Sequence, residues 1–126
     1  MTLTPIPGSY AICQLAPDAP LPAWATHGSL WSVTRSRTEL SIVCDASGVP
    51  PGVRARAPWR ALMIQGPLAL DLTGVLASLA SPLAAAGVAL FAVSTYDTDY
   101  VLVLAADVER ALMALRQAGH HIDEAQ

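Results

Sequence analysis

The segment Asp71-Leu72-Thr73-Gly74-Val75 has the residue types expected where a strand leads into an anion-binding helix. Backbone N–H groups at a helix start attract negative charge, and a residue without Cβ lets a ligand carboxylate approach closely. Asp71 or Thr73 can cap this helix, with Gly74 and Val75 near its first turn. The segment therefore predicts a site for a carboxylate group, and the alternative is a plain helix cap.

A second candidate group is the acidic turn Asp97-Thr98-Asp99. Two carboxylates in a short turn suit either a divalent cation or simple turn formation. In a β-α-β-β-α-β unit, the turn between the second and third strands lies at a sheet end, where a partner module can meet the helix start. Asp99 or Asp97 can there hold an ammonium or guanidinium group. The two segments together predict a site for a zwitterion.

No pattern in the sequence predicts catalysis. The chain has no phosphate-binding loop, no Cys-x-x-Cys pair and no Ser-His-Asp order. His120 and His121 are adjacent, and adjacent side chains point apart, so they are not expected to share a metal ion. We therefore predict a protein that is not an enzyme and that has no resident metal or cofactor.

The composition predicts a globular chain with a sizeable core. Hydrophobic residues make up 53% of the 126 residues and charged residues 13%. The formal net charge is -3, which does not favour binding to nucleic acid. No secretion signal follows Met1, so a cytoplasmic protein is expected. Cys13 and Cys44 lie in apolar, strand-like runs and are expected to be buried free thiols.

One long apolar stretch raises the alternative of a membrane span. Residues 72–96 contain no charged side chain. Pro82 and Gly87 interrupt this stretch, acidic residues flank it on both sides, and its apolar residues are periodic. We therefore predict a soluble helix and strand here and no membrane partner.

Two segments of the chain resemble each other sixty residues apart. Residues 30–44 read LWSVTRSRTELSIVC and residues 90–104 read LFAVSTYDTDYVLVL. Each segment has the pattern of a strand, a polar turn and a second strand. A shorter match relates residues 11–14 to residues 62–65. We therefore predict an internal duplication, with repeats at residues 1–58 and 59–126.

The second repeat has the β-α-β-β-α-β pattern of the ferredoxin-like split unit. Apolar residues from Leu72 to Leu83 follow one face of a helix that Gly87 ends. Pro82 lies inside this helix and is expected to loosen its last turn, because it cannot donate a hydrogen bond to Ser78. The other predicted elements are strands at 62–65, 88–95, 100–105 and 121–122, and a helix that Asp107 caps and Gly119 ends.

The first repeat is expected to be degraded and poor in helix. It has predicted strands at 10–15, 30–34 and 40–44, and prolines between them leave no room for regular helices. The predicted fold class is therefore α+β, with two ferredoxin-like repeats. Sheet surface that no helix covers predicts a homodimer, because exposed apolar surface usually marks an interface.

Four segments occur in an order that resembles a known family. They are WRALMIQGP at 59–67, LTGVLAS at 72–78, PLAAAGV at 82–88 and STYDTDY at 94–100. This series resembles the bacterial ACT-domain proteins related to the CASTOR arginine sensors. The resemblance implies two tandem ACT-type repeats and assembly into a homodimer through sheet and helix contacts.

The resemblance also implies a ligand site between ACT-type units. In the sensors, backbone of a glycine-containing loop and an acidic side chain hold an amino acid; the matching positions are Thr73, Gly74 and Val75 for the loop and Asp99 for the acid. Asp71 matches a further acidic site position. The implied function is a regulatory sensor of a free amino acid, arginine or another. The sensors have four ACT units and this chain has two, so the alternative is a structural dimerisation module without a ligand.

Overall fold

The computed structural model of the chain describes residues 1–66 and 74–124. The chain forms two compact units, which we call the N-terminal unit (Pro7–Trp59) and the C-terminal unit (Met1–Ile6 with Arg60–Gln126). Strands β1 (Thr2–Leu15) and β4 (Arg54–Ile64) each contribute residues to both units.

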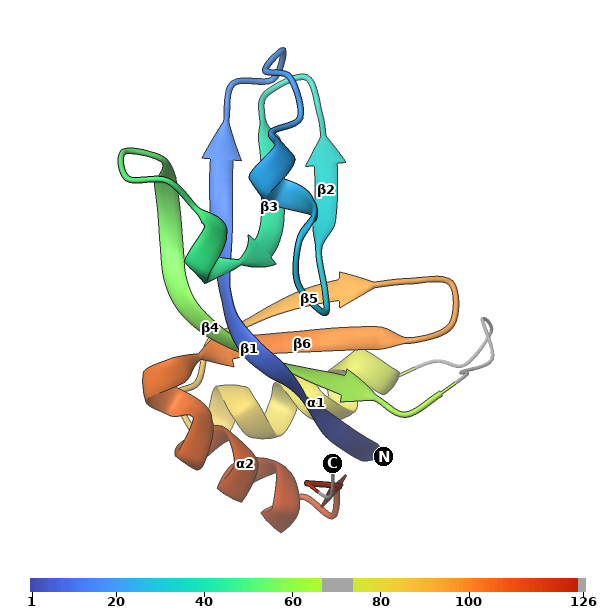
Figure 1. The fold of residues 1–126 in the computed structure, drawn as a ribbon. Helices are drawn as coiled ribbons and strands as arrows, with labels where there is room; N and C mark the ends of the chain where they lie inside the picture. Colours follow the sequence, from blue (N-terminus) through green and yellow to red (C-terminus); the bar gives the residue numbers. More distant parts are fainter. Residues whose placement is uncertain (67–73, 125–126) are drawn as a thin grey trace. The chain divides into compact units, whose positions relative to one another are not determined.

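The C-terminal unit contains the helices α1 and α2 in the predicted β-α-β-β-α-β order. After the end of β4 come α1 (Val75–Ala85), β5 (Leu90–Ser94), β6 (Asp99–Leu104), the 3-10 turn η3 (Ala105–Asp107), α2 (Val108–Gln117) and β7 (His121–Ile122) (Figure 1). The α+β fold predicted from the periodic spacing of apolar residues is thus confirmed for this unit. Among the described residues, no helix has the length and hydropathy of a membrane span.

The start of β1 is a strand of the C-terminal unit that the sequence did not predict. The neighbouring strands of this unit are β5-β6-β4-β1-β7, and β1 pairs in parallel with β7. The amide of Gln65 donates to the carbonyl of Thr2 at 2.9 Å, and Leu3 is fully buried. The C-terminal unit therefore contains a strand from the start of the chain in addition to the elements predicted for residues 59–126. Pro5 and Pro7 conceal this strand in the sequence, because proline is uncommon inside strands.

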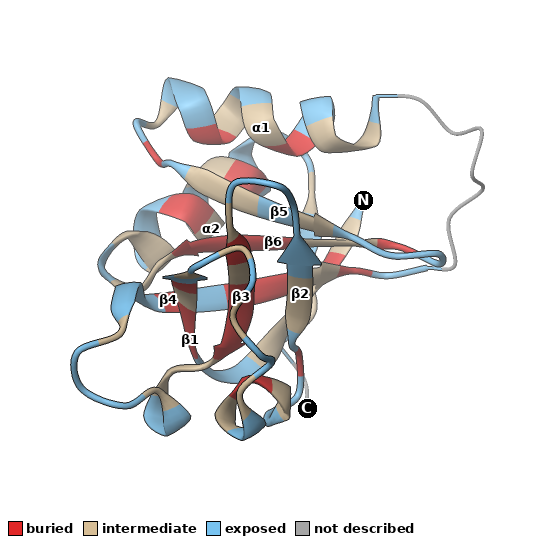
Figure 2. Cartoon of the chain, turned by 90° about the horizontal axis from the view of Figure 1, so that it is seen from above, coloured by how far each residue is buried: buried red, intermediate tan, exposed pale blue. Residues whose placement is uncertain are grey.

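Both helices pack with their apolar sides on one face of this sheet. Figure 2 shows buried and half-buried residues along the inner sides of α1 and α2 and exposed residues along their outer sides. Ala111 and Leu115 of α2 are fully buried, as its periodicity predicts. The buried core of the unit consists of Leu3, Leu62, Ile64, Leu79, Leu83, Val88, Val101, Val103, Ala111, Leu115 and Ile122.

Glycine ends each helix, whereas the predicted acidic cap makes a different contact. Gly87 and Gly119 have φ values of 74° and 95°, a left-handed conformation that glycine adopts without strain. Asp107 stands at the N-cap position of α2 but makes no capping hydrogen bond. Its carboxylate instead accepts a hydrogen bond from Arg110 at 2.9 Å. The predicted position is right and the predicted capping interaction is wrong.

Pro82 does not end α1, because another side chain replaces the missing hydrogen bond. A proline at position 82 cannot donate to the carbonyl of Ser78. His120 Nε2 lies 3.0 Å from that carbonyl oxygen. Since a carbonyl can only accept, Nε2 carries the hydrogen. The α2–β7 turn therefore supplies the donor that α1 lacks.

The N-terminal unit is built from strands and short turns, as its prolines predict. Strands β1, β2 (Ser32–Arg35) and β3 (Leu40–Asp45) are antiparallel in the order β2-β3-β1. Residues 7–59, all described, contain the 3-10 turns η1 (Ala23–Thr26) and η2 (Ala46–Gly48) and no α-helix. The Arg35 guanidinium donates to the carbonyls of Pro17 and Ala19, which holds the proline-rich loop against the end of β2.

The two hairpins correspond at fifty-nine residues and not at the predicted sixty. Arg35 pairs with Leu40 at one turn, and Ser94 pairs with Asp99 at the other. Both turns enclose four residues, so Arg35 corresponds to Ser94. A shift of one residue moves a side chain to the opposite face of a strand. The identical strand residues Val33 and Val93, and likewise Val43 and Val103, therefore face opposite sides when the two hairpins are compared.

Cys13 and Cys44 are fully buried on neighbouring strands, as predicted. Cys13 pairs with Ile42, and Ala11 pairs with Cys44, so the two thiols occupy diagonal positions on one face. Burial raises the pKa of Cys13. Burial, and then the nearby Cys13, raise the pKa of Cys44 to about 12. Both groups are therefore protonated thiols near neutral pH and poor nucleophiles.

We expect both cysteines to stay reduced and to react slowly with a thiol reagent under native conditions. Reaction requires opening of the unit, so labelling is expected to be about a thousandfold slower than in the unfolded chain. Mass spectrometry after timed alkylation, with and without denaturant, measures this ratio. Rapid native labelling, or a Cys13–Cys44 disulfide in purified protein, would contradict the expectation.

The contact between His120 and Ser78 predicts a coupling between His120 and Pro82. His120→Ala is expected to lower the free energy of unfolding by about 1 kcal/mol in the parent chain. The loss should be smaller in a Pro82→Ala background, because an alanine at that position donates its own N–H to the carbonyl of Ser78. Denaturant unfolding of the four proteins measures the coupling. His121→Ala, at a neighbouring exposed residue, is the control, and an equal loss in both backgrounds would refute the coupling.

Candidate functional site

The β5–β6 turn is fixed to the end of β4 by one buried hydroxyl. The amide of Thr95 donates to the carbonyl of Thr98 at 2.8 Å, which closes the turn. The hydroxyl of Thr98 donates to the carbonyl of Ile64, the last residue of β4, at 2.6 Å. Thr98 is 9% exposed. The acidic turn is thus held in one position relative to the strand that leads toward α1.

The register of β6 places Asp99 on the face of the sheet that the helices cover. Val101 and Val103 contribute to the core beneath the helices, and side chains two residues apart share a face. Asp99 therefore lies on that face at the beginning of β6. Ser94 is paired with Asp99 on β5 and shares the face with Leu90, which packs against the same core. A carboxylate and a hydroxyl are thus neighbours at one end of the sheet.

The described part of α1 begins at the predicted glycine. Gly74 is the N-cap residue, with a φ of 77°. Its carbonyl accepts the first helical hydrogen bond, from Ser78, at 2.9 Å. The positive φ by itself explains a glycine at this position, because residues with a Cβ rarely adopt it. The N–H groups of the first helical turn, which starts at Val75, are donors without partners in the helix.

The start of α1 and the β5–β6 turn lie at the same end of the C-terminal unit (Figures 1 and 2). Gly74, Val75 and Asp99, three of the predicted site residues, are thus at one end of one unit. Asp71 and Thr73, the other two, lie outside the described residues. The arrangement offers N–H donors for a carboxylate and an acid for a cationic group.

Two residues at this end were missed by the sequence analysis. Ser94 becomes a neighbour of Asp99 through the pairing of β5 with β6, and this register is not visible before the turn length is known. Thr98 reads as an ordinary turn residue in the sequence, and its bond to Ile64 joins residues that are far apart in the chain. In the comparison of residues 30–44 with residues 90–104, Thr98 is aligned with the identical Thr38. This identity was the one available signal, and it carries no information about burial.

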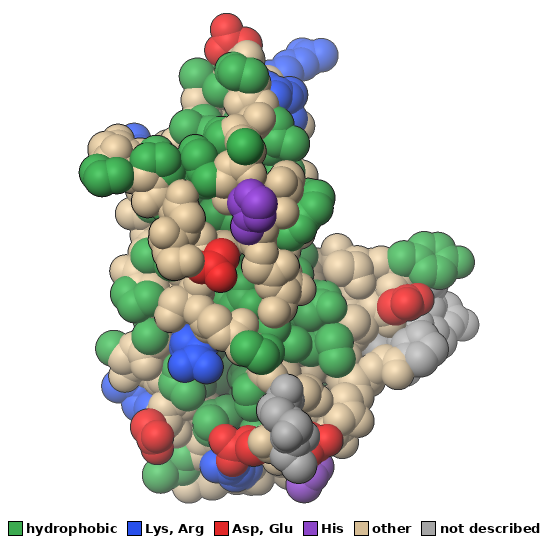
Figure 3. Space-filling view, in the orientation of Figure 1, with side chains coloured by type: hydrophobic (Ala, Val, Ile, Leu, Met, Phe, Trp, Pro, Cys, Tyr) green, Lys and Arg blue, Asp and Glu red, His purple; other side chains and the backbone are tan. Residues whose placement is uncertain are grey.

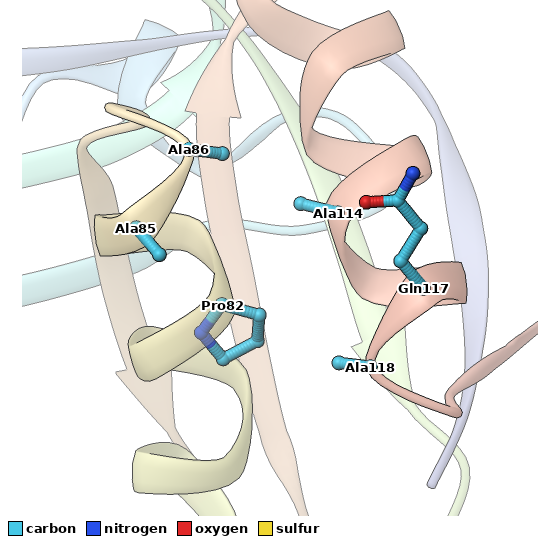
Figure 4. Close-up of a pocket in the computed structure, with 6 residues that line it drawn as sticks. All are labelled: Pro82, Ala85, Ala86, Ala114, Gln117 and Ala118. Carbon is cyan, nitrogen blue, oxygen red and sulfur yellow. The ribbon is translucent and has the colours of Figure 1, made fainter.

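A groove between the helices lies apart from these residues. Figure 4 shows its lining, and its volume is about 350 Å³. The lining residues are Pro82, Ala85, Ala86, Ala114, Gln117 and Ala118. Gln117 supplies the one polar side chain of this lining, and no charged group faces the groove. A zwitterion would lose its hydration there without compensation, so the end of the sheet is the better candidate for an amino acid.

Charged side chains of both signs are exposed on the surface of the described residues. On the face drawn in Figure 3, arginine and acidic side chains lie among apolar ones. No three His, Cys, Asp or Glu side chains of residues 1–66 and 74–124 gather where they could hold a metal ion. The Asp99 carboxylate makes no hydrogen bond or ion pair with any described residue.

Family comparisons divide the chain close to the boundary between the units. The family model described as ACT domain matches residues 54–117, which include β4, α1, β5, β6 and α2. The model of an N-terminal domain matches residues 8–52. No curated protein matches the sequence.

Solved structures with the same fold come from several bacteria. A protein of Agrobacterium tumefaciens is 40% identical, with a TM-score of 0.92 over 99% of this chain and 93% of its own. A Vibrio cholerae protein, described as a possible transport protein of unknown function, is 20% identical, with a TM-score of 0.76 over 93% and 88%. The ligand-free regulatory subunit of aspartate kinase from Thermus thermophilus is 16% identical, with a TM-score of 0.62 over 89% and 93%. The last two likenesses show a shared fold.

Proposed function

Because the chain belongs to the ACT-domain family, we propose that it is a small regulatory module that binds a free amino acid and catalyses no reaction. The regulatory subunit of aspartate kinase shares this fold, which supports a regulatory role. The proposed ligand site consists of Gly74 and Val75 at the start of α1 and Asp99 as its acid, together with Asp71 and Thr73, which match site positions of the sensors in sequence. Arginine is the first ligand to test, as in the sensors that the sequence resembles.

The observation that carries this proposal is the register of β6. It puts Asp99 on the helix-covered face, at the end of the sheet where α1 begins. A free amino acid has a carboxylate, which suits the N–H groups of a helix start, and one or two cationic groups, which suit an acid. Asp97 lies in the turn and not on the strand, so Asp99 is the better candidate of the two acids.

We also propose that the chain is a tandem duplication of ACT-like repeats at residues 1–58 and 59–126. The strand orders β2-β3-β1 and β5-β6-β4 support this. In each order the second strand of a hairpin, β3 or β6, lies next to the strand that begins the proposed repeat, β1 or β4. The one-residue difference in hairpin register requires a deletion or insertion after the duplication.

A homodimer is the third part of the proposal. Strand β5 ends the strand order and carries the sequence LFAVS, which has neither a charge nor a proline. Proteins usually protect such an edge with charges, prolines or a covering segment. An edge strand that carries neither a charge nor a proline suits pairing with the same strand of a second copy. The amino acid would then lie between ACT-like units, as in the sensors.

The ligand prediction is tested by a thermal-shift screen of the twenty amino acids. One of them should raise the melting temperature, because a ligand at a hundred times its Kd adds about 2.7 kcal/mol to the native state. Asp99→Asn keeps the shape of the side chain and removes its charge. Calorimetric titration of this variant should show a loss of about 1.5–3 kcal/mol in binding free energy.

Two further variants make the ligand test specific. Gly74→Asn places a side chain at the start of α1. Asn is chosen because it tolerates a positive φ, whereas a β-branched residue such as Val would strain the backbone and by itself destabilise the helix. Asp97→Asn, at an exposed acid two residues away, is the matched control and should bind like the parent. Unchanged affinity in Asp99→Asn and Gly74→Asn would disprove the site. If no amino acid at millimolar concentration stabilises the parent, the module is structural.

The dimer prediction is tested by light scattering at micromolar concentration. The parent is expected to have twice the mass of the chain. Ala92→Lys at the exposed centre of β5 is expected to be a monomer, because a charged side chain on an edge strand opposes pairing with a second copy. Ala77→Lys, on the exposed side of α1, is the control for a general effect of charge. A monomeric parent would reject the dimer, and a dimer lost only in Ala77→Lys would reject β5 as its interface.

A further inference from the structure

Thr98 is buried although its side chain is polar. Apart from the aromatic side chains of Tyr10 and Trp59, it is the one buried residue with a polar side chain among the described residues. A buried hydroxyl without a hydrogen bond costs stability, and a valine of the same shape has no such cost. A threonine at this position therefore needs a compensating interaction.

Every polar group of Thr98 has a hydrogen-bond partner. Its hydroxyl donates to the carbonyl of Ile64 at 2.6 Å. Its amide donates to the hydroxyl of Thr95 at 3.2 Å, and its carbonyl accepts from the amide of Thr95 at 2.8 Å. The Thr98 carbonyl also accepts from the hydroxyl of Thr95 at 3.1 Å. The three bonds with Thr95 are local and would close the turn by themselves. The bond to Ile64 is different, because it joins the turn to another strand.

The bond to Ile64 acts on the position of Asp99. Asp99 follows Thr98 directly, and Ile64 is the last residue of β4, the strand that leads toward α1. Fixing Thr98 to Ile64 therefore fixes the start of β6 relative to the end of β4. A charge-assisted contact weakens quickly when its acid moves by a fraction of an ångström.

We propose that Thr98 is a positioning residue that holds Asp99 for recognition of a cationic ligand group. This inference rests on the proposed function and adds a residue to it: the Thr98 hydroxyl acts through Asp99 and does not touch the ligand. The recognised group is an ammonium or guanidinium, so the effect of Thr98 appears in the discrimination between a charged ligand and a neutral one of the same shape.

The test compares L-arginine with L-citrulline, in which a neutral ureido group replaces the guanidinium. The parent should bind arginine about tenfold more tightly or better. Thr98→Val removes the hydroxyl and keeps the shape of the side chain. Its ratio of arginine affinity to citrulline affinity should fall to within about twofold of the ratio in Asp99→Asn. Thr98→Ser keeps the hydroxyl and should retain the preference of the parent. A purely structural role would lower the melting temperature of Thr98→Val and leave this ratio unchanged.

A double variant shows whether Thr98 acts through Asp99. The double variant Thr98→Val/Asp99→Asn should prefer arginine to citrulline no less than Asp99→Asn alone does, because the charge that Thr98 positions is already absent. Additive losses would overturn the inference, and so would an unchanged ratio in Thr98→Val. A parent that binds an amino acid without preferring arginine to citrulline would overturn it as well. If the parent binds no amino acid, the proposed function itself fails, which is a different result.

Discussion

Successive side chains of a strand point to opposite faces of the sheet, and this alternation along β6 determines much of the C-terminal unit. Val101 and Val103 are two residues apart, so they share one face of the sheet, and both are buried in the core beneath the helices. The same two-residue spacing places Asp99 on the helix-covered face, where it is half-buried. A polar residue can therefore share a face with the core and still be half exposed. The two-residue period thus relates the helix-covered core to the location of the candidate site.

The helices contribute to this arrangement in different ways. Helix α2 has charged residues on its outer side and apolar ones on its inner side, so its orientation follows from the hydrophobic effect. Helix α1 has no charged residue, and Pro82 interrupts its hydrogen bonds. Specific contacts therefore replace polarity as the means of orienting it: the His120 bond at Ser78 and the buried residues Leu79 and Leu83.

Features that depend on nearby residues were predicted well from the sequence. The glycines at 87 and 119 and the inner residues of α2 are local or periodic signals, and the structure confirms them. Features that depend on distant residues were not predicted. The strand at Thr2–Ile6 becomes recognisable only through its partners near residues 65 and 121. The pairing of Ser94 with Asp99 and the bond from Thr98 to Ile64 also require the register of the folded sheet.

The position of the first strand has a consequence for how the chain folds. Leu3 is paired with Ile122, so the first and last strands of the C-terminal unit are separated by nearly the whole described sequence. Contacts with such large sequence separation form slowly, because the loop that they close has a high entropic cost. The ribosome releases Leu3 long before Ile122, and the N-terminal unit lies between them in the sequence. The N-terminal unit can therefore complete its sheet during synthesis, whereas the C-terminal unit can add its last strand only after Ile122 has emerged.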